Sequence, residues 1–261
     1  MTGQTASQRP RLVLVHGWAQ HAGIWQAWRE RLAPIADMTA VDLPGHGGTP
    51  WKNAIRSLDA LADSVLAALE QPAALCGWSL GGMIAMNLAR RHPSRVTRLV
   101  LCNTTPRFVA GHDWIHAVQP SLVEGFRRRV SENPERVLRD FLSLQLRGES
   151  DSRQTLTLLR SALTDQNRPR AAALEFTLSL LAQTDLRDEL AAIAPPTLVI
   201  ASDADAITPL AAGEYLARQL PDARLLTVTG CGHAGFLSRP ERLSPELDEF
   251  LGGESVQEMA S

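Results

Sequence analysis

The sequence has few cysteines, few aromatic residues and no long apolar run. Its three cysteines, Cys76, Cys102 and Cys231, are odd in number and scattered, which excludes a disulfide framework and a CxxC metal or redox pair. No run approaches the roughly 20 apolar residues that span a bilayer, and the first ten residues hold no apolar stretch of signal-peptide length. We therefore predict a cytoplasmic protein with reduced thiols and no membrane association.

A surplus of positive charge is also missing. The 261 residues carry 26 Lys and Arg against 28 Asp and Glu, a formal net charge of −2, which argues against a nucleic-acid partner. With 44% hydrophobic and 21% charged residues, the chain has the composition of an ordinary globular protein. Its length is enough to bury one sizeable core.

Short aliphatic or β-branched runs alternate with helical stretches, which predicts an α/β fold with a mostly parallel sheet flanked by helices. The expected strands are 12–15, 38–43, 73–78, 96–102, 197–201 and 224–228. Apolar residues over 57–70 recur at helical spacing and predict one stripe facing the sheet. Thr208 and Pro209 predict a helix that is capped by the threonine and has proline in its first turn.

The alternation stops between residues 106 and 182, where four helical patterns occur and no strand candidate appears. We interpret this stretch as a helical cap inserted into a core formed by 1–105 and 183–261. The small, polar tail after Leu251 is expected to fray.

The strongest local signal is Gly77-Trp78-Ser79-Leu80-Gly81, with a predicted strand before it and a helical run after it. A tight turn between strand and helix forces the serine into a strained conformation, and the flanking glycines let neighbouring backbones approach. The hydroxyl then stands clear of the sheet. The pattern predicts that Ser79 is a nucleophile.

A serine hydroxyl needs a base to take its proton, and His233 follows the last predicted strand in the glycine-rich loop 230–235. His112 and His116 have the spacing of metal ligands on a helix, but no third ligand is evident, so we predict no metal.

An acid must hold the base in its tautomer, and the expected chain order is serine, acid, histidine. Asp203 and Asp205 both qualify; we favour Asp205, which stands just before an apolar residue and the helix that proline opens.

The oxyanion of an acyl transfer needs preorganised donors. The backbone N–H of Leu80, which follows the nucleophile, is the first candidate, and that of Trp18, in the turn after the first strand, is the second. His16 in the same turn is interpreted as structural. Nothing near Cys231 in the sequence would lower the pKa of its thiol, so we do not expect it to react.

With these residues in this order, the chain resembles the α/β-hydrolase superfamily and, within it, the pimeloyl-[acyl-carrier protein] methyl ester esterases of biotin synthesis. The likeness covers nearly the whole chain, through the motifs LVLVHGW, VDLPGHG, GWSLGG, HPSRV and HAGF and the cap segment RVLRDFLSLQ.

Two features depart from the family. Only about eleven residues precede the first strand, so the opening β-hairpin is expected to be short or missing. Gly235 stands where proline is usual, which could loosen the histidine loop.

The resemblance implies a serine carboxylesterase without cofactor that cleaves the methyl ester of a pimeloyl chain bound to an acyl carrier protein. It places Trp18, Ser79, Leu80 and His233 in contact with substrate, together with a cap wall of Phe141, Leu142, Ser143, Leu144 and Gln145. Trp78 is a further candidate for the lining of the acyl slot. These cap residues could instead serve only to pack the cap on itself.

Acyl carrier proteins are acidic, so exposed cap arginines could dock one: Arg136, Arg139, Arg147, Arg153 and Arg160. We expect a monomer that acts on a carrier-linked or small ester. A broad short-chain carboxylesterase or another hydrolase of small acyl substrates stays open as an alternative, because fold does not dictate substrate. A non-catalytic receptor that uses the pocket only for binding is a further alternative, and covalent labelling of Ser79 would exclude it.

Overall fold

A single six-stranded sheet forms the centre of the protein, with all strands parallel in the order β2-β1-β3-β4-β5-β6. The computed structural model describes residues 9–150, 152–162 and 167–252. The strands are β1 (Arg11–Val15), β2 (Asp37–Val41), β3 (Ala73–Trp78), β4 (Val96–Cys102), β5 (Thr197–Ser202) and β6 (Ala223–Val228). β3 and β4 have the bounds that the sequence predicts, and the other four differ by one or two residues at one end or, for β2, at both.

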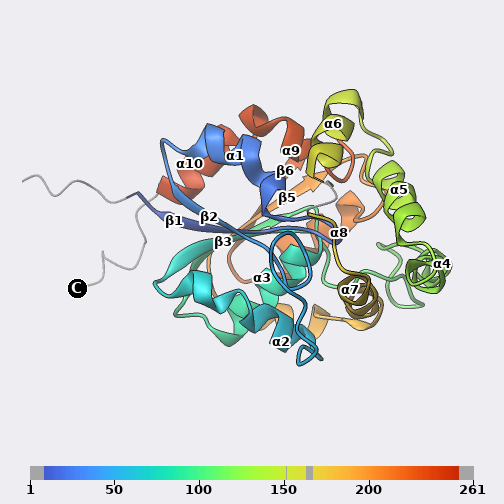
Figure 1. Ribbon diagram of the computed structural model, residues 1–261. Coiled ribbons are helices and arrows are strands. Elements are labelled where there is room, and N and C mark those ends of the chain that lie inside the picture. Colours follow the sequence, from blue (N-terminus) through green and yellow to red (C-terminus); the bar gives the residue numbers. More distant parts are fainter. Residues whose placement is uncertain (1–8, 151, 163–166, 253–261) are drawn as a thin grey trace, which may run out of the picture.

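Helices cover both faces of the sheet, which confirms the predicted α/β architecture (Figure 1). One face carries α1 (Gln26–Leu32), α9 (Gly235–Ser238) and α10 (Ser244–Gly252), with the 3-10 helices η1 (Ala22–Trp25) and η4 (Pro240–Arg242). The other carries α2 (Leu58–Asp63), η2 (Leu66–Leu69), α3 (Leu80–Arg91), η3 (Arg187–Ala192) and α8 (Leu210–Gln219). Each face buries its own apolar core, because side chains alternate across the strands.

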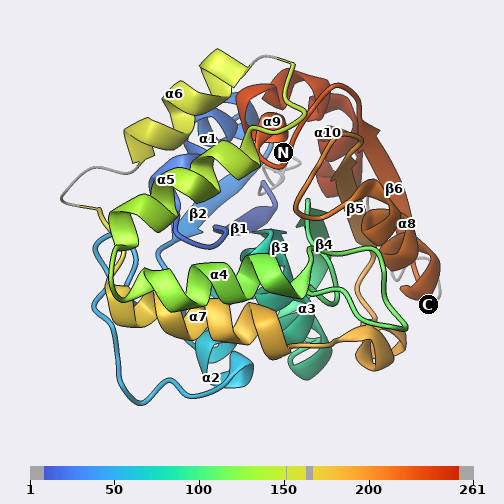
Figure 2. The same cartoon turned by 90° about the vertical axis from the view of Figure 1, so that its right-hand side faces the viewer.

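The inserted helical region lies at one end of the sheet, as Figure 2 shows from its outer side. It consists of α4 (Pro120–Val130), α5 (Pro134–Gln145), α6 (Ser152–Ala162) and α7 (Ala171–Gln183). The strands of a parallel sheet all end at one edge, and the cap covers that edge. The domain boundaries at 105/106 and 182/183 stay a prediction, as does fraying of the tail, since 253–261 lie outside the described residues.

The apolar stripe predicted over 57–70 is confirmed, since Leu61, Val65 and Leu69 are buried in the core on the α2 side of the sheet. Two short helices carry it instead of one: α2 ends at Asp63, and the hydroxyl of Ser64 donates to the carbonyl of Leu61 at 2.6 Å, which gives the backbone an alternative to helical bonding. The prediction of a threonine cap on the later helix was wrong. Helix α8 begins after Pro209, with no side-chain cap. The Thr208 hydroxyl binds Asp205 instead of capping the helix.

β2 forms an edge of the described sheet, with β1 as its one strand neighbour there. The expectation of a short or missing opening hairpin concerns residues 1–8, which lie outside the described part. Within that part, no helix is both long and apolar enough to cross a bilayer.

Candidate active site

Ser79 occupies the sharp turn between β3 and α3, with φ 55° and ψ −117°. This left-handed conformation is strained for a residue with a side chain and needs firm support. The turn is tight enough that a Cβ at Gly77 would overlap the carbonyl of Gly81, and one at Gly81 would overlap the carbonyl of Val15. Glycine at both positions therefore lets the elbow close, as the sequence predicts.

His233 lies in the loop after β6 and is completely buried. Its Nδ1 is 2.7 Å from Oδ2 of Asp205, and since a carboxylate can only accept, the ring nitrogen carries the proton. Nε2 is then the basic nitrogen; it is buried and has no hydrogen-bond partner among the described residues. The ring packs 5.5 Å, between centroids, from that of Trp78, the neighbour of Ser79.

Asp205 is 6% exposed, and its carboxylate is fully engaged. Oδ1 accepts from the backbone N–H groups of Ile207 at 2.7 Å and Thr208 at 3.0 Å, and Oδ2 accepts from the Thr208 hydroxyl at 2.6 Å as well as from the histidine. Asp203, the alternative, binds the backbone N–H of Gly230 at 2.8 Å. Of the two acids, the structure brings Asp205 to the histidine ring and uses Asp203 to hold the loop.

The two backbone N–H groups predicted as oxyanion donors come from segments that meet at Ser79: Leu80 follows it in the chain, and Trp18 follows Gly17, which packs against the serine side chain. Leu80 is the first residue of α3, where N–H groups have no acceptor within the helix. Gly17 packs so closely that an added Cβ would lie 3.2 Å from the Cβ of Ser79. In the part of the chain that the structure describes, neither N–H has a hydrogen-bond acceptor. The role of both groups as oxyanion donors stays a prediction.

Two buried histidines stabilise the loops behind this turn. Nε2 of His16 accepts from the backbone N–H of Leu43 at 3.0 Å, and its Nδ1 donates to the carbonyl of Gly17 at 2.8 Å. The ring of His46 lies 5.3 Å from it. Burial, and then the neighbouring His46, hold the pKa of His16 well below its usual value, and burial lowers the pKa of His46 to about 4. Both rings are therefore neutral at pH 7 and act structurally.

The loop that carries His233 is attached to the segment after α5. Glu149 accepts from the backbone N–H of Gly232 at 3.1 Å and forms an ion pair with Arg239 at 3.1 Å. A Cβ at Gly235 would overlap the Glu149 carboxylate. Glycine at this position thus makes room for a bond between cap and loop, while loosening of the loop stays a prediction. Burial raises the pKa of the Cys231 thiol in this loop, which keeps it protonated.

The cap closes over the site through aromatic contacts with Trp18. The Trp18 ring stacks on Phe126 at 6.4 Å and meets Phe141 edge-on at 4.8 Å, and its Nε1 donates to the carbonyl of Leu174 in α7 at 3.2 Å. These rings line a tight apolar cavity together with Leu144 and aliphatic side chains of α4 and α7. Phe141 and Leu144 thus face the cavity beside Trp18.

The other predicted wall residues of α5 are divided between two faces. Leu142 and Ser143 line an outer groove between α5 and α6. Gln145 is completely buried, and both atoms of its amide lack a partner among the described residues. Trp78 lies beneath the histidine, where its Nε1 donates to the carbonyl of His233 at 3.2 Å, and is not among the residues that line the apolar cavity.

All five predicted docking arginines are exposed on the cap. None of them forms an ion pair within the described ranges, in contrast to Arg127 and Arg129 of α4, which pair with Glu124 and Asp140. The outer groove brings Arg139 and Arg160 together with Arg168, which the sequence analysis missed. The other three do not line it: Arg136, Arg147 and Arg153.

Sequence reasoning assigned Thr208 to a helix cap and missed its bond to Asp205, and it did not single out Asn103. Thr208 stands three residues after the acid, so its closeness to Asp205 in the chain was the available signal. Asn103 binds the histidine loop from β4, across 130 residues, and no sequence pattern indicates such a contact.

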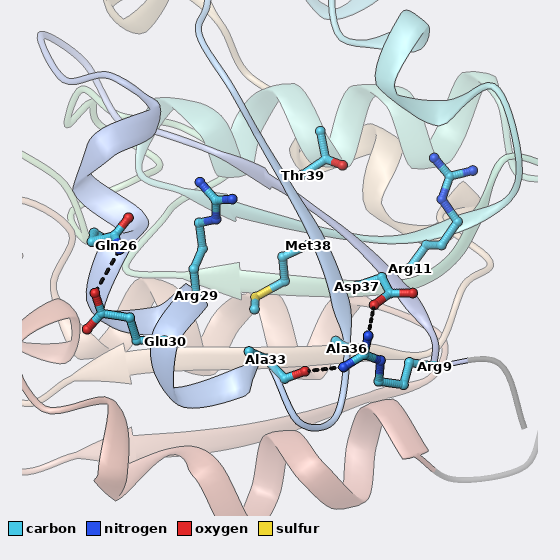
Figure 3. A pocket seen from close by; sticks show the side chains of 10 residues that line it. All are labelled: Arg9, Arg11, Gln26, Arg29, Glu30, Ala33, Ala36, Asp37, Met38 and Thr39. Atoms are coloured by element: carbon cyan, nitrogen blue, oxygen red, sulfur yellow. Dashed lines mark hydrogen bonds and ion pairs between the residues drawn. The ribbon is translucent and has the colours of Figure 1, made fainter.

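A separate surface pocket lies near the amino ends of β1 and β2 (Figure 3). Arg9 spans it, with an ion pair to Asp37 at 2.8 Å and a hydrogen bond to the carbonyl of Ala33 at 2.7 Å. None of the catalytic candidates lines it. Among the described residues, no group of three or more His, Cys, Asp or Glu side chains is arranged to hold a metal ion.

Comparison with known proteins agrees with this geometry. Residues 10–240 match the family described as alpha/beta hydrolase fold. The chain belongs to the α/β-hydrolase family. Among relatives in this family, the pimeloyl-[acyl-carrier protein] methyl ester esterase of Aromatoleum aromaticum is 42% identical over 94% of this chain and 99% of its own. The protein of the same name from Nitrosomonas europaea is 38% identical over 92% of this chain and 94% of its own.

Solved structures support the family assignment. A hydrolase from Pseudomonas aeruginosa has a TM-score of 0.78 at 27% identity, covering 95% of this chain and 92% of its own. An esterase from Exiguobacterium antarcticum has a TM-score of 0.84 at 20% identity, with 94% and 92% covered, a likeness that concerns the fold alone. The predicted resemblance to the α/β-hydrolase superfamily is confirmed.

Proposed function

We propose that this chain is a serine carboxylesterase that hydrolyses the methyl ester of a pimeloyl chain carried by an acyl carrier protein. The observation that carries the chemistry is the state of His233: one ring nitrogen is bound to Asp205, and the other is buried, unpartnered and beside the Ser79 elbow. The names of the relatives support the substrate.

In the proposed reaction, Ser79 Oγ attacks the ester carbonyl while Nε2 of His233 takes the hydroxyl proton. The N–H groups of Trp18 and Leu80 bind the resulting oxyanion, and Asp205 stabilises the imidazolium. When the tetrahedral intermediate collapses, the C–O bond to the methoxy group breaks, and His233 returns the proton to the departing methanol. A water molecule, deprotonated by His233, then attacks the acyl-serine. The acid is released, and Ser79 regains its proton.

The cap residues fit a substrate with an apolar chain. Trp18 joins the oxyanion turn to the cavity lined by Phe126, Phe141 and Leu144, so a carbonyl held at the turn has apolar side chains beside it. We assign the chain of the substrate to this cavity, whose volume of about 10 Å³ requires the cap side chains around it to move apart when the chain enters. The buried amide of Gln145, which has no partner in the described part of the protein, is a candidate contact for a polar atom of the ester.

Carrier docking is assigned to the outer groove of the cap. Exposed arginines without an ion pair can bind an acidic partner, and no existing ion pair has to break. Such charge complementarity mainly raises the rate of association. Arg139 of α5 and Arg160 of α6 line this groove together with the apolar Leu142. The remaining candidates, Arg136, Arg147 and Arg153, are assigned to its surroundings. Cytoplasmic location and the monomeric state stay predictions from the sequence.

The test compares a carrier-linked methyl ester with a free short-chain ester. For the double variant Arg139→Gln/Arg160→Gln, we expect kcat/KM on the carrier-linked ester to fall by about tenfold and to lose much of its salt dependence, while the free ester is unaffected. Arg127→Gln, an exposed cap arginine that is already paired, serves as the matched control.

An unchanged carrier-linked rate and salt dependence in the double variant would contradict the docking assignment. Rapid hydrolysis of free short-chain esters with no activity on the carrier-linked ester would favour the general short-chain carboxylesterase. The catalytic assignments of Ser79, Asp205 and His233 would survive that result.

A further inference from the structure

The three residues that leave β4, Cys102, Asn103 and Thr104, are bonded to both halves of the site. The carbonyl of Cys102 accepts from the backbone N–H of Ser79 at 3.1 Å, and the hydroxyl of Thr104 donates to the carbonyl of Ser79 at 2.7 Å. The strained backbone of the elbow is thus held at both its N–H and its carbonyl group.

Asn103, between these two residues, binds the loop of the base. Its Nδ2 donates to the carbonyl of His233 at 2.8 Å and lies 3.3 Å from that of Gly232. The same amide binds the end of β5: Nδ2 is 2.9 Å from the Ser202 hydroxyl, and Oδ1 accepts from the Ser202 N–H at 2.8 Å. One side chain therefore connects the strand behind Ser79, the strand that leads to Asp205 and the backbone of His233.

The backbone conformation and the burial of Asn103 both favour these hydrogen bonds. Its φ is 38°, in the left-handed region that asparagine tolerates better than most residues, and its own N–H donates to the carbonyl of Ile200 at 2.8 Å. It is 1% exposed, so bulk water does not compete for its hydrogen bonds. An aspartate has the same shape but no N–H to donate, so it cannot replace the amide.

We propose that Asn103 is a positioning residue, which fixes the backbone of His233 relative to Ser79 so that Nε2 can reach the serine hydroxyl. The inference rests on the proposed esterase function. The histidine loop contains Gly230, Gly232 and Gly235, whose backbones are intrinsically free, and so its placement depends on contacts such as this one. A displacement of about 1 Å at a reacting group lowers a rate by as much as ~100-fold.

Asn103→Asp and Asn103→Gly test the proposal on a free chromogenic ester and by the rate at which a fluorophosphonate labels Ser79. The first variant keeps the shape and removes the donor, and the second removes the amide without straining a positive φ. We expect kcat and the labelling rate to fall about 10- to 100-fold, with KM within about twofold of wild type. The low-field proton resonance of the His233–Asp205 hydrogen bond should shift or broaden.

Asn87→Ala is the matched control. Asn87 is also a buried asparagine with a bonded amide, but its Nδ2 donates to Asp59 at 2.7 Å, away from the histidine loop. We expect it to lower the melting temperature and leave kcat near wild type. Folded Asn103 variants with kcat within about twofold of wild type, or a fall in kcat that Asn87→Ala reproduces, would overturn the proposal.

If neither Asn103 variant folds, Trp78→Phe removes the other side-chain donor to the His233 carbonyl. A fall in kcat of several-fold at constant KM supports the proposal, and an unchanged kcat overturns it. A wild-type protein that neither hydrolyses esters nor reacts with the fluorophosphonate would instead refute the proposed function itself. The two failures are therefore distinguishable.

Discussion

The carboxyl edge of the sheet and the cap above it are built in opposite ways. At the sheet edge, buried polar side chains such as Asp205, Asn103 and Thr104 have their hydrogen bonds satisfied within the protein before any substrate binds. In the cap, the candidate contacts are apolar rings such as Phe141 and arginines such as Arg139 that have no ion pair in the described ranges. The contrast agrees with the proposed function, in which the core performs the reaction and the cap selects the substrate.

Loss of the nucleophile should have the largest effect. We expect Ser79→Ala to lower kcat by at least ~10⁴-fold on every ester, because the variant has no hydroxyl at the elbow to form the acyl intermediate. Circular dichroism should be unchanged, and steady-state hydrolysis measures the effect. Substantial remaining turnover by a purified variant would contradict the assignment of Ser79.

The acid comes next, with its sequence neighbour as control. Asp205→Asn should lower kcat by about 10⁴-fold, since an amide no longer stabilises the imidazolium or fixes its tautomer. Asp203→Asn keeps an oxygen that can accept from Gly230 and should stay within a few-fold of wild type. Comparable losses in both variants, measured on one ester, would show that the choice between the two acids is wrong.

A cap substitution should change selectivity and leave the chemistry intact. Phe141→Ala removes an aromatic ring from the wall of the apolar cavity, and with it apolar contacts that a long chain would make, so kcat/KM for a seven-carbon acyl ester should fall about 10-fold or more, while that for an acetyl ester changes little. Ser143→Ala, on the exposed face of the same helix, is the control. Equal losses for the long and the short ester would assign Phe141 to packing alone.

The buried histidines predict that the folded protein becomes less stable as the pH falls. Because burial lowers the pKa of His46 to about 4, the unfolded chain binds a proton below about pH 6.5 that the folded protein excludes until pH 4. The contribution of His46 to the free energy of unfolding is complete above pH 6.5 and decreases by about 3 kcal/mol as the pH falls to 4. Urea unfolding at several pH values should show that the free energy of unfolding of His46→Asn changes less with pH than that of the wild type. The exposed cap variant His112→Gln should leave the slope unchanged, and equal slopes for all three proteins would refute the prediction.

Within the sheet and its edge, features that depend on a local pattern could be predicted from the sequence, and features that depend on long-range contacts could not. β3 is buried throughout and β4 ends in the apolar run Leu99–Cys102. Ser79 has a local turn motif, and the order of serine, acid and histidine follows from the fold, so short patterns are sufficient for them. Asn103 acts through contacts with β5 and the His233 loop that depend on the order of the strands. Its role becomes visible only in three dimensions.

The cap was predictable as a set of helices, and less so in its contacts. Helical spacing predicts that α5 has an apolar face, but which of its residues lies over the site depends on how the helix is placed. Phe141 and Leu144 face Trp18, whereas Leu142 and Ser143 line the outer groove. Arg168 reaches that groove from the segment before α7, and no local pattern links it to Arg139.

The most direct test of the proposed function is mass spectrometry of a pimeloyl-carrier methyl ester incubated with catalytic amounts of this protein. The account predicts that the carrier-bound chain loses the mass of one methylene unit, that its thioester stays intact, and that Ser79→Ala is inert. An unchanged mass, under conditions in which free short-chain esters are hydrolysed, would contradict the proposed substrate.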